Sequence, residues 1–138
     1  ILLPKIDSKY PSSLSKNVIT NILREELEFK GVVITDDMTM GAIIENYDIG
    51  EASIKAVQAG NDIVLVAHGY ENKVKVVNSL INAVKDGTIS EVRIDESVER
   101  ILHLKEKYNI SDRLLDEIDI NKINQSSEEI LGALQWTT

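Results

Sequence analysis

Two short apolar runs, at residues 32–35 and 62–67, constrain the fold of this chain more than any other feature. The first has the sequence Val-Val-Ile-Thr and the second Asp-Ile-Val-Leu-Val-Ala. Neither run alternates with polar residues, and both are rich in β-branched side chains, which is typical of strands buried on both faces of a parallel sheet. Parallel strands need a crossover connection, so the helical pattern between the runs predicts a right-handed βαβ unit and an α/β fold class.

Helices are expected on both sides of these runs, where apolar residues recur at helical spacing. The four segments are residues 15–28, 48–60, 74–84 and 95–104. Each has residue types at its ends that commonly begin or terminate helices. The residues expected to begin or end these helices are Ser13 or Ser15, Asp48, Gly60, Asp86, Gly87 and Asp95.

The last part of the chain has a different character. From residue 111 onward it is rich in Asp, Asn and Ser, and Ile118, Ile120 and Ile123 follow no clean period. We expect a docking segment with one short helix at residues 127–134 and with Trp136 packing at its end. The chain is therefore divided into a segment at residues 1–110 and a C-terminal tail at residues 111–138.

Composition narrows the classes of partner. With a net charge of −8 and a pI near 4.7, the chain is poorly suited to bind nucleic acid or an anionic membrane surface, both of which are polyanions. No run approaches the roughly 20 apolar residues of a membrane span. The absence of cysteine fits a reducing compartment, so a cytoplasmic location is favoured. Because the first residue is Ile rather than Met, we expect the natural N-terminus to lie upstream.

A carboxylate pair, Asp36-Asp37, directly follows the first apolar run. In parallel α/β folds the active site is assembled at the carboxyl ends of the strands, which favours a functional role for the pair. The alternative is that an Asp in this place begins the next helix as its N-cap. Spacing alone gives the two interpretations about equal weight.

The sequence around this pair closely resembles family 3 glycoside hydrolases, especially the β-N-acetylglucosaminidase branch. The strongest resemblance lies in Leu-Arg-Glu-Glu-Leu at residues 23–27 and in Phe-Lys-Gly-Val-Val-Ile-Thr-Asp-Asp-Met-Thr-Met at residues 29–40, and it extends over roughly residues 3–110. It implies the C-terminal portion of a (β/α)₈ TIM-type barrel. It also implies a retaining mechanism in which Asp36 is the nucleophile that attacks the anomeric carbon of a terminal N-acetylglucosamine. Asp37 would then point elsewhere, since successive strand side chains alternate.

A retaining hydrolase also needs an acid/base group. The resemblance to this branch implies that the acid/base group is a histidine, paired with an aspartate, on an upstream loop that carries a Lys-His-Phe-Pro-Gly type motif. The present sequence lacks this motif. His68 follows the second run and is a candidate for the sugar pocket, although an ordinary loop role is the commoner one; His103 is expected at a surface or between helices. Of Met38 and Met40, one is expected in the core and one in the pocket wall, with Met40 the substrate-binding candidate.

No cofactor and no metal are expected. The glycines are too scattered for a phosphate-binding loop, and neither histidine has a second ligand at convincing metal spacing. The expected partners are a saccharide containing N-acetylglucosamine, from cell-wall muropeptides or from chitin, and either the missing N-terminal portion of the barrel or further copies in a homo-oligomer. We expect the chain to be inactive alone.

Two other classes of protein compete with this hypothesis. One is a non-catalytic structural or interaction module that oligomerises through open strand edges. The other is a compact flavodoxin-like binding domain, which the alternation of strands and helices would allow. Two strands argue against the latter, because doubly wound domains typically need about five.

Overall fold

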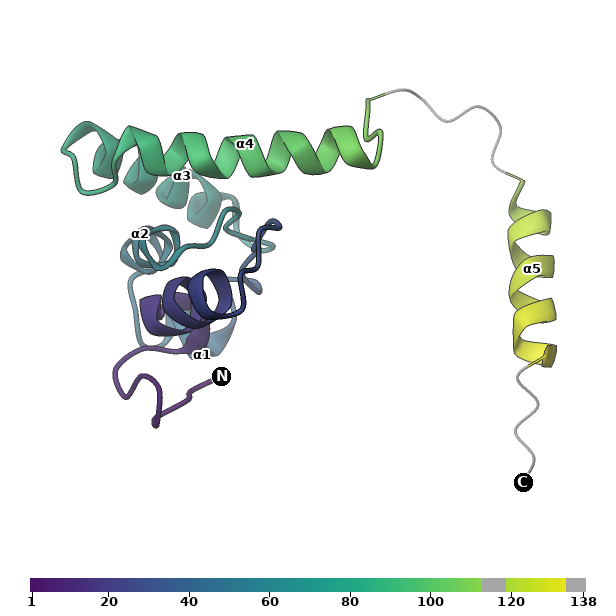
Figure 1. The fold of residues 1–138 in the computed structure, drawn as a ribbon, viewed down its shortest axis with the longest axis horizontal. Helices are drawn as coiled ribbons and strands as arrows, with labels where there is room; N and C mark the ends of the chain where they lie inside the picture. Colours follow the sequence, from purple (N-terminus) through teal and green to yellow (C-terminus); the bar gives the residue numbers. More distant parts are fainter. Residues whose placement is uncertain (113–118, 134–138) are drawn as a thin grey trace.

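The structure, a computed structural model, describes residues 1–112 and 119–133. Within them the chain is mostly helical (Figure 1), and α2 packs against α3 and η1, whereas α5 lies apart from the other helices. The elements in chain order are a 3₁₀ helix η1 (Ser12–Leu14), a π-helix η2 (Asn17–Glu26), and α-helices α1 (Gly41–Ile44), α2 (Ile49–Ala59), α3 (Tyr70–Lys85), α4 (Glu91–Lys107) and α5 (Ile120–Ala133).

The two apolar runs lie side by side and parallel, but they do not form the two full strands that the sequence predicts. In the described part of the chain they share one isolated parallel bridge, between Ile34 and Ile63. The burial on both faces that is typical of a complete parallel sheet is not reached in this chain, because Ile34 is 53% exposed and Leu65 is 40% exposed. The pairing is short because side-chain oxygens from distant positions in the sequence accept several amides that a regular ladder would direct to carbonyl groups.

The ends of α2 follow the local rules of helix capping. The Asp48 side chain accepts hydrogen bonds from the amides of Gly50 at 2.9 Å and Glu51 at 3.3 Å. Gly60 ends the helix in the left-handed region with φ of 114°, which a residue without Cβ adopts at little cost. Both ends of this helix were predicted correctly.

Two other helices differ from the expectation, one in where it begins and one in its type. α4 begins at Glu91, where the Ser90 side chain accepts from the amide of Arg93, so Asp95 lies inside the helix rather than at its start. The first long helix is of π type, and its Leu27 amide donates to the Ile22 carbonyl.

The remaining helix ends bear out the expectation in part. Ser15, not Ser13, supports the start of η2, because its hydroxyl accepts from the Val18 amide at 3.3 Å. The turn at Asp86 and Gly87 ends α3 as expected, with Gly87 at φ of 79°. In the tail, α5 begins at Ile120, seven residues before the expected helix. Ile118, Leu134 and Trp136 lie outside the described residues.

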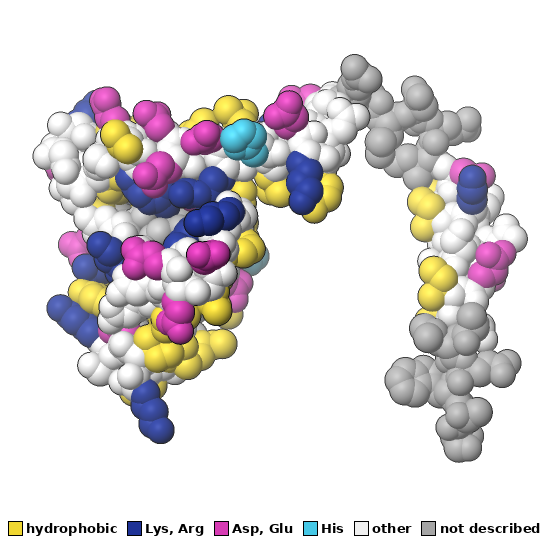
Figure 2. Space-filling model, viewed as in Figure 1, with side chains coloured by type: hydrophobic (Ala, Val, Ile, Leu, Met, Phe, Trp, Pro, Cys, Tyr) yellow, Lys and Arg dark blue, Asp and Glu magenta, His cyan; other side chains and the backbone are white. Residues whose placement is uncertain are grey.

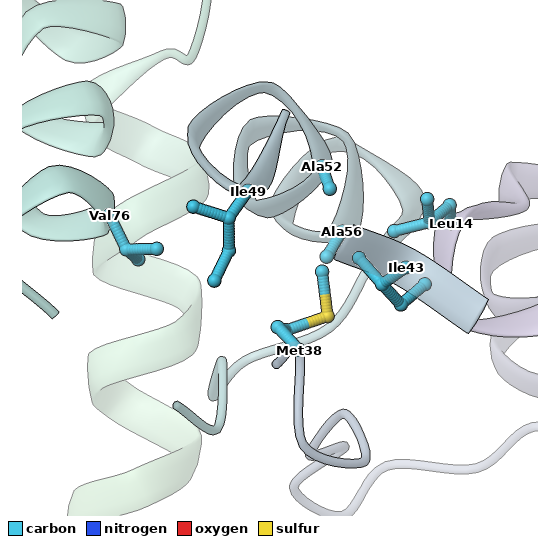
Figure 3. Close-up of a cluster of buried hydrophobic side chains, with 7 residues drawn as sticks. All are labelled: Leu14, Met38, Ile43, Ile49, Ala52, Ala56 and Val76. Atoms are coloured by element: carbon cyan, nitrogen blue, oxygen red, sulfur yellow. The ribbon is translucent and has the colours of Figure 1, made fainter. Parts of the chain in front are cut away.

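The core lies between α2, α3 and the loop after the first run (Figure 3). Its buried members are Leu14, Met38, Ile43, Ile49, Ala52, Ala56 and Val76. Val64 and Val66 of the second run pack against this cluster, so the side of the run facing the helices is covered while Leu65 remains exposed on the other. None of the described helices is long and apolar enough to cross a membrane.

Candidate active site

The carboxylate pair lies in a bulge at the carboxyl end of the first run. The Thr35 amide donates to the Ile63 carbonyl at 3.0 Å, and the next backbone-to-backbone bond between the two segments is from the Met38 amide to the Leu65 carbonyl at 2.9 Å. Three residue steps on the first run therefore match two on the second. Such a bulge changes the direction of the side chains it contains, and bulges are frequent next to active sites.

Asp36 is exposed and borders a small hollow. Its Oδ1 accepts from the Asp37 amide at 2.8 Å, which is the one hydrogen bond to this carboxylate from residues 1–112 and 119–133. The hollow has a volume of about 100 Å³, and both carboxylates and Met40 line it. The Asp36 carboxylate is thus free to meet a ligand from solvent.

Asp37, by contrast, is held by protein donors. Its Oδ1 accepts from the amides of Ala67 at 2.9 Å and Thr39 at 3.0 Å, and its Oδ2 accepts from the Thr39 hydroxyl at 2.5 Å. The Ala67 amide, followed by the two Thr39 donors, lowers the pKa of Asp37 to about 2. The two neighbouring carboxylates therefore have different surroundings, and Asp37 is committed to structure.

The other candidate residues are spread over different environments. Met38 is 1% exposed and belongs to the core, whereas Met40 is half exposed at the hollow. The Nε2 of His68 lies 3.9 Å from Asp37 Oδ2, and its side chain is 84% exposed. His103 is exposed on α4. Met40 and His68 thus lie at the same end as Asp36. Met38 also borders the hollow from the core side, whereas His103 is not among its lining residues.

A buried carboxylate at the opposite end of the runs was not anticipated. Asp62 has no exposed side-chain surface, and its oxygens contact Arg24 Nη2 at 2.5 Å, Arg100 Nη1 at 3.0 Å, the Ser97 hydroxyl at 3.0 Å and the Val33 amide at 3.0 Å. Burial opposes ionisation, but the Val33 amide, Ser97 and Arg24 outweigh it and lower the pKa of Asp62 below its ordinary value. The available signal was a charged residue at the start of an apolar run together with arginines on two helical segments.

A larger hollow of about 590 Å³ lies away from the pair, around Tyr10, Lys55 and Arg93. Its carboxylate, Asp7, is already bonded to the Ser15 hydroxyl at 2.6 Å and to two backbone amides. This hollow is the larger of the two, but its carboxylate is occupied by protein donors. The hollow at Asp36 is the better candidate active site, because a reacting carboxylate must be accessible. No group of three or more potential metal ligands occurs among residues 1–112 and 119–133.

Comparison with known proteins identifies the family. Residues 1–104 match the model of the glycosyl hydrolase family 3 N-terminal domain. The chain belongs to glycosyl hydrolase family 3. The resemblance inferred from residues 29–40 is thereby confirmed.

Several relatives of this family 3 chain have known structures or curated descriptions. The structure of a family 3 β-N-acetylglucosaminidase from Paenibacillus sp. strain FPU-7 is 42% identical with a TM-score of 0.81, over 86% of this chain and 23% of that one. An uncharacterized secreted glycosyl hydrolase of Arthroderma benhamiae is 35% identical over 75% of this chain and 30% of its own length. A β-hexosaminidase of Vibrio cholerae is 37% identical over 58% of this chain and 24% of its own. The chain thus spans less than a third of the length of these relatives.

Proposed function

We propose that the chain forms part of the catalytic (β/α)₈ barrel of a retaining glycoside hydrolase that removes terminal β-N-acetylglucosamine, with Asp36 as nucleophile. The observation that carries the proposal is the contrast within the carboxylate pair: Asp36 is open to a hollow, whereas Asp37 is occupied by three donors. The similarity to the Paenibacillus β-N-acetylglucosaminidase supports the substrate class.

The chemistry follows from a single accessible carboxylate. An oxygen of Asp36 attacks the anomeric carbon as the bond from that carbon to the leaving oxygen breaks, which gives a glycosyl ester. An acid/base group donates a proton to the leaving oxygen and then activates the water that cleaves the ester. The family resemblance assigns that group to a loop motif that the present sequence lacks, so we expect the 138-residue chain alone to show no turnover above background.

Met40 and His68 are proposed as parts of the sugar-binding wall. Met40 lines the same hollow as Asp36 and offers a polarizable apolar surface, suited to the face of a sugar ring. His68 is exposed beside Asp37, where its ring can donate to a sugar hydroxyl. In the complete enzyme, Met40→Ala and His68→Ala should raise KM more than they lower kcat.

The nucleophile is tested in a hybrid enzyme, in which this chain replaces the matching part of the Paenibacillus enzyme. Asp36→Asn keeps the side-chain shape but removes the charge, so activity on an aryl β-N-acetylglucosaminide should fall by about 10³-fold or more while folding is retained. A 2-fluoro sugar that traps the intermediate should label the peptide containing Asp36. The control is Asp95→Asn, which changes an exposed carboxylate on α4 and should leave activity intact. Labelling elsewhere, or an active Asp36→Asn hybrid, refutes the proposal.

A non-catalytic oligomerising module is the second candidate. It is favoured by the exposed apolar side chains Phe29, Ile34 and Leu65 along and before the two runs. A hybrid that is folded but inactive, together with a discrete oligomer of the 138-residue chain in light scattering, would favour this candidate over the enzyme.

A further inference from the structure

We propose that Asp37 is a positioning residue, which holds the bulge that directs Asp36 by joining the carboxyl ends of the two runs. This inference rests on the proposed function, because it concerns how the nucleophile is aimed. It also makes a structural claim that can be measured without any activity.

The two runs are joined by side chains where a ladder would use carbonyl groups. The Val33 amide donates to the Asp62 carboxylate at 3.0 Å, and the Leu65 amide donates to the Thr35 hydroxyl at 3.0 Å. The third such bond, from the Ala67 amide to Asp37 Oδ1 at 2.9 Å, lies at the end that carries the hollow. Each of these bonds crosses between runs that are about 30 positions apart in the sequence, so each fixes one run against the other.

At the bulge this third bond has a particular importance. Asp36 lies between the bond from Thr35 to Ile63 and the bond from Met38 to Leu65, and its own carboxylate accepts from the following amide. Met38 is anchored in the core, which fixes the far side of the bulge. Asp37 ties its middle to the second run, and it also ties the turn that follows through Thr39.

The carboxylate suits this task better than an amide would. It accepts from three donors, two amides and one hydroxyl, and an ionised carboxylate has acceptor sites on both oxygens. Asn at this position keeps one acceptor oxygen and brings an NH₂ group toward the donors, whereas Ala removes all three bonds. The two substitutions should therefore have graded effects.

The chain contains a matched control for this contact. Asp86-Gly-Thr88 has the same Asp-x-Thr spacing as Asp37-Met-Thr39, and Asp86 accepts from the Thr88 amide at 2.9 Å. Among the described residues, the Asp86 carboxylate bonds only within its own turn, to Thr88. Asp86→Asn thus changes the same kind of turn without changing the hydrogen bond from the Ala67 amide to Asp37 that links the two runs.

The first measurement is amide hydrogen exchange in the 138-residue chain. Asp37→Asn and Asp37→Ala should speed the exchange of the Ala67 amide, by about 10-fold and about 10²-fold, while amides within α2 keep their rates. Asp86→Asn should leave Ala67 unchanged. If Ala67 exchanges at the original rate in both Asp37 variants, the positioning role is overturned. Should the Ala variant fail to fold, Asn and Thr39→Val supply the same test with smaller changes.

The second measurement is kinetic and uses the hybrid enzyme. A misplacement of about 1 Å at a reacting group can cost about 10²-fold in rate, so kcat should fall by about 10-fold in Asp37→Asn and about 10²-fold in Asp37→Ala, with KM changed less than about twofold. Unchanged kcat in both variants, beside an inactive Asp36→Asn hybrid, overturns the inference but leaves the proposed function. An active Asp36→Asn hybrid overturns the proposed function. The exchange rates then test only whether Asp37 holds the carboxyl ends of the two runs together.

Discussion

Asp62 holds α4 to the rest of the described chain. Arg93 on this helix also donates to the Asn61 carbonyl at 2.8 Å and to the Val57 carbonyl at 3.2 Å. Several apolar side chains of α4, among them Val92 and Leu102, are exposed. Polar contacts to this buried carboxylate and to nearby carbonyl groups therefore supply much of the attachment that apolar packing supplies elsewhere, as in the cluster around α2.

Replacing that carboxylate should destabilise the chain. Asp62→Asn leaves three partly buried arginines without their counter-charge, and removing one partner of a buried ion pair costs about 3–5 kcal/mol. We expect the lower end, about 3 kcal/mol, because the arginine side chains remain 12% to 29% exposed. Urea unfolding at one fixed protein concentration measures the change.

The matched control is Glu96, a half-exposed carboxylate near two of the same arginines, at 3.9 Å from Arg93 and 3.8 Å from Arg100. Glu96→Gln should cost at most about 1 kcal/mol, as exposed ion pairs do. Equal losses in the two variants would contradict the assignment of α4 attachment to Asp62.

The carboxylates of Asp37 and Asp62 should make the free energy of unfolding depend on pH in the acid range. The pKa values of Asp37 and Asp62 are both lowered in the folded chain, that of Asp37 to about 2. A lowered pKa means that the stabilisation is present in full above the ordinary value of 3.8 and is lost as the pH falls toward the folded value. The urea midpoint should therefore drop between pH 4 and pH 2, and the Asp62→Asn variant should show a shallower drop. Identical pH profiles would argue against the ionised form of Asp62 as the stabilising one.

Helix positions were largely predictable from sequence, whereas the pairing of the runs was not. Asp48, Gly60 and Gly87 act within a few residues of their own position, so local rules found them. The single bridge at Ile34 depends on side-chain acceptors that are distant in the sequence, such as Asp62. The spacing of apolar residues along the chain does not predict such contacts. The π geometry of η2 was missed for a related reason, because the apolar spacing of an α-helix and of a wider helix differ little over ten residues.

The candidate site was predictable in part. The position directly after an apolar run pointed to the Asp36-Asp37 pair. The bond from Ala67 and the choice between Met38 and Met40 required the three-dimensional contacts. The roles of Asp36, Met40 and His68 stay predictions that the experiments above address.

The C-terminal glycine of α2 offers a test of helix termination. At Gly60, a Cβ would lie 3.0 Å from Thr20 Oγ1 and 3.1 Å from Ile19 Cγ2, and Thr20 is itself bonded to the Ala59 carbonyl at 2.7 Å. Gly60→Ala should therefore add crowding to the cost of a left-handed backbone and destabilise by about 2–3 kcal/mol. Gly87 also has a positive φ, but there is open space around the new Cβ. Gly87→Ala should therefore cost only about 1 kcal/mol. Thermal unfolding of the two variants compares them, and equal costs would exclude crowding at Gly60.

Apolar surface is exposed over much of the described chain (Figure 2), including one edge of α5. On the two runs it consists chiefly of Ile34 and Leu65, on the side away from the helices. Paired strands with an uncovered apolar face and open edges attract further chains. The face of the two runs that carries Ile34 and Leu65 is therefore the surface most suited to contact a further chain.

We therefore expect the 138-residue chain to associate in solution, and we expect the uncovered face of the two runs to be the contact. Replacing Ile34 and Leu65 together by Thr places a β-branched side chain at both positions but removes much of the apolar area, so it should weaken association by at least about tenfold, or about 1.4 kcal/mol. Leu102→Thr, on the exposed side of α4, is the matched control and should leave association unchanged. Sedimentation velocity over a range of concentrations measures the three proteins. A monomer with sharp, cooperative unfolding would show that the described helices already form a sufficient core. A larger effect of Leu102→Thr than of the double substitution would move the contact from the runs to α4.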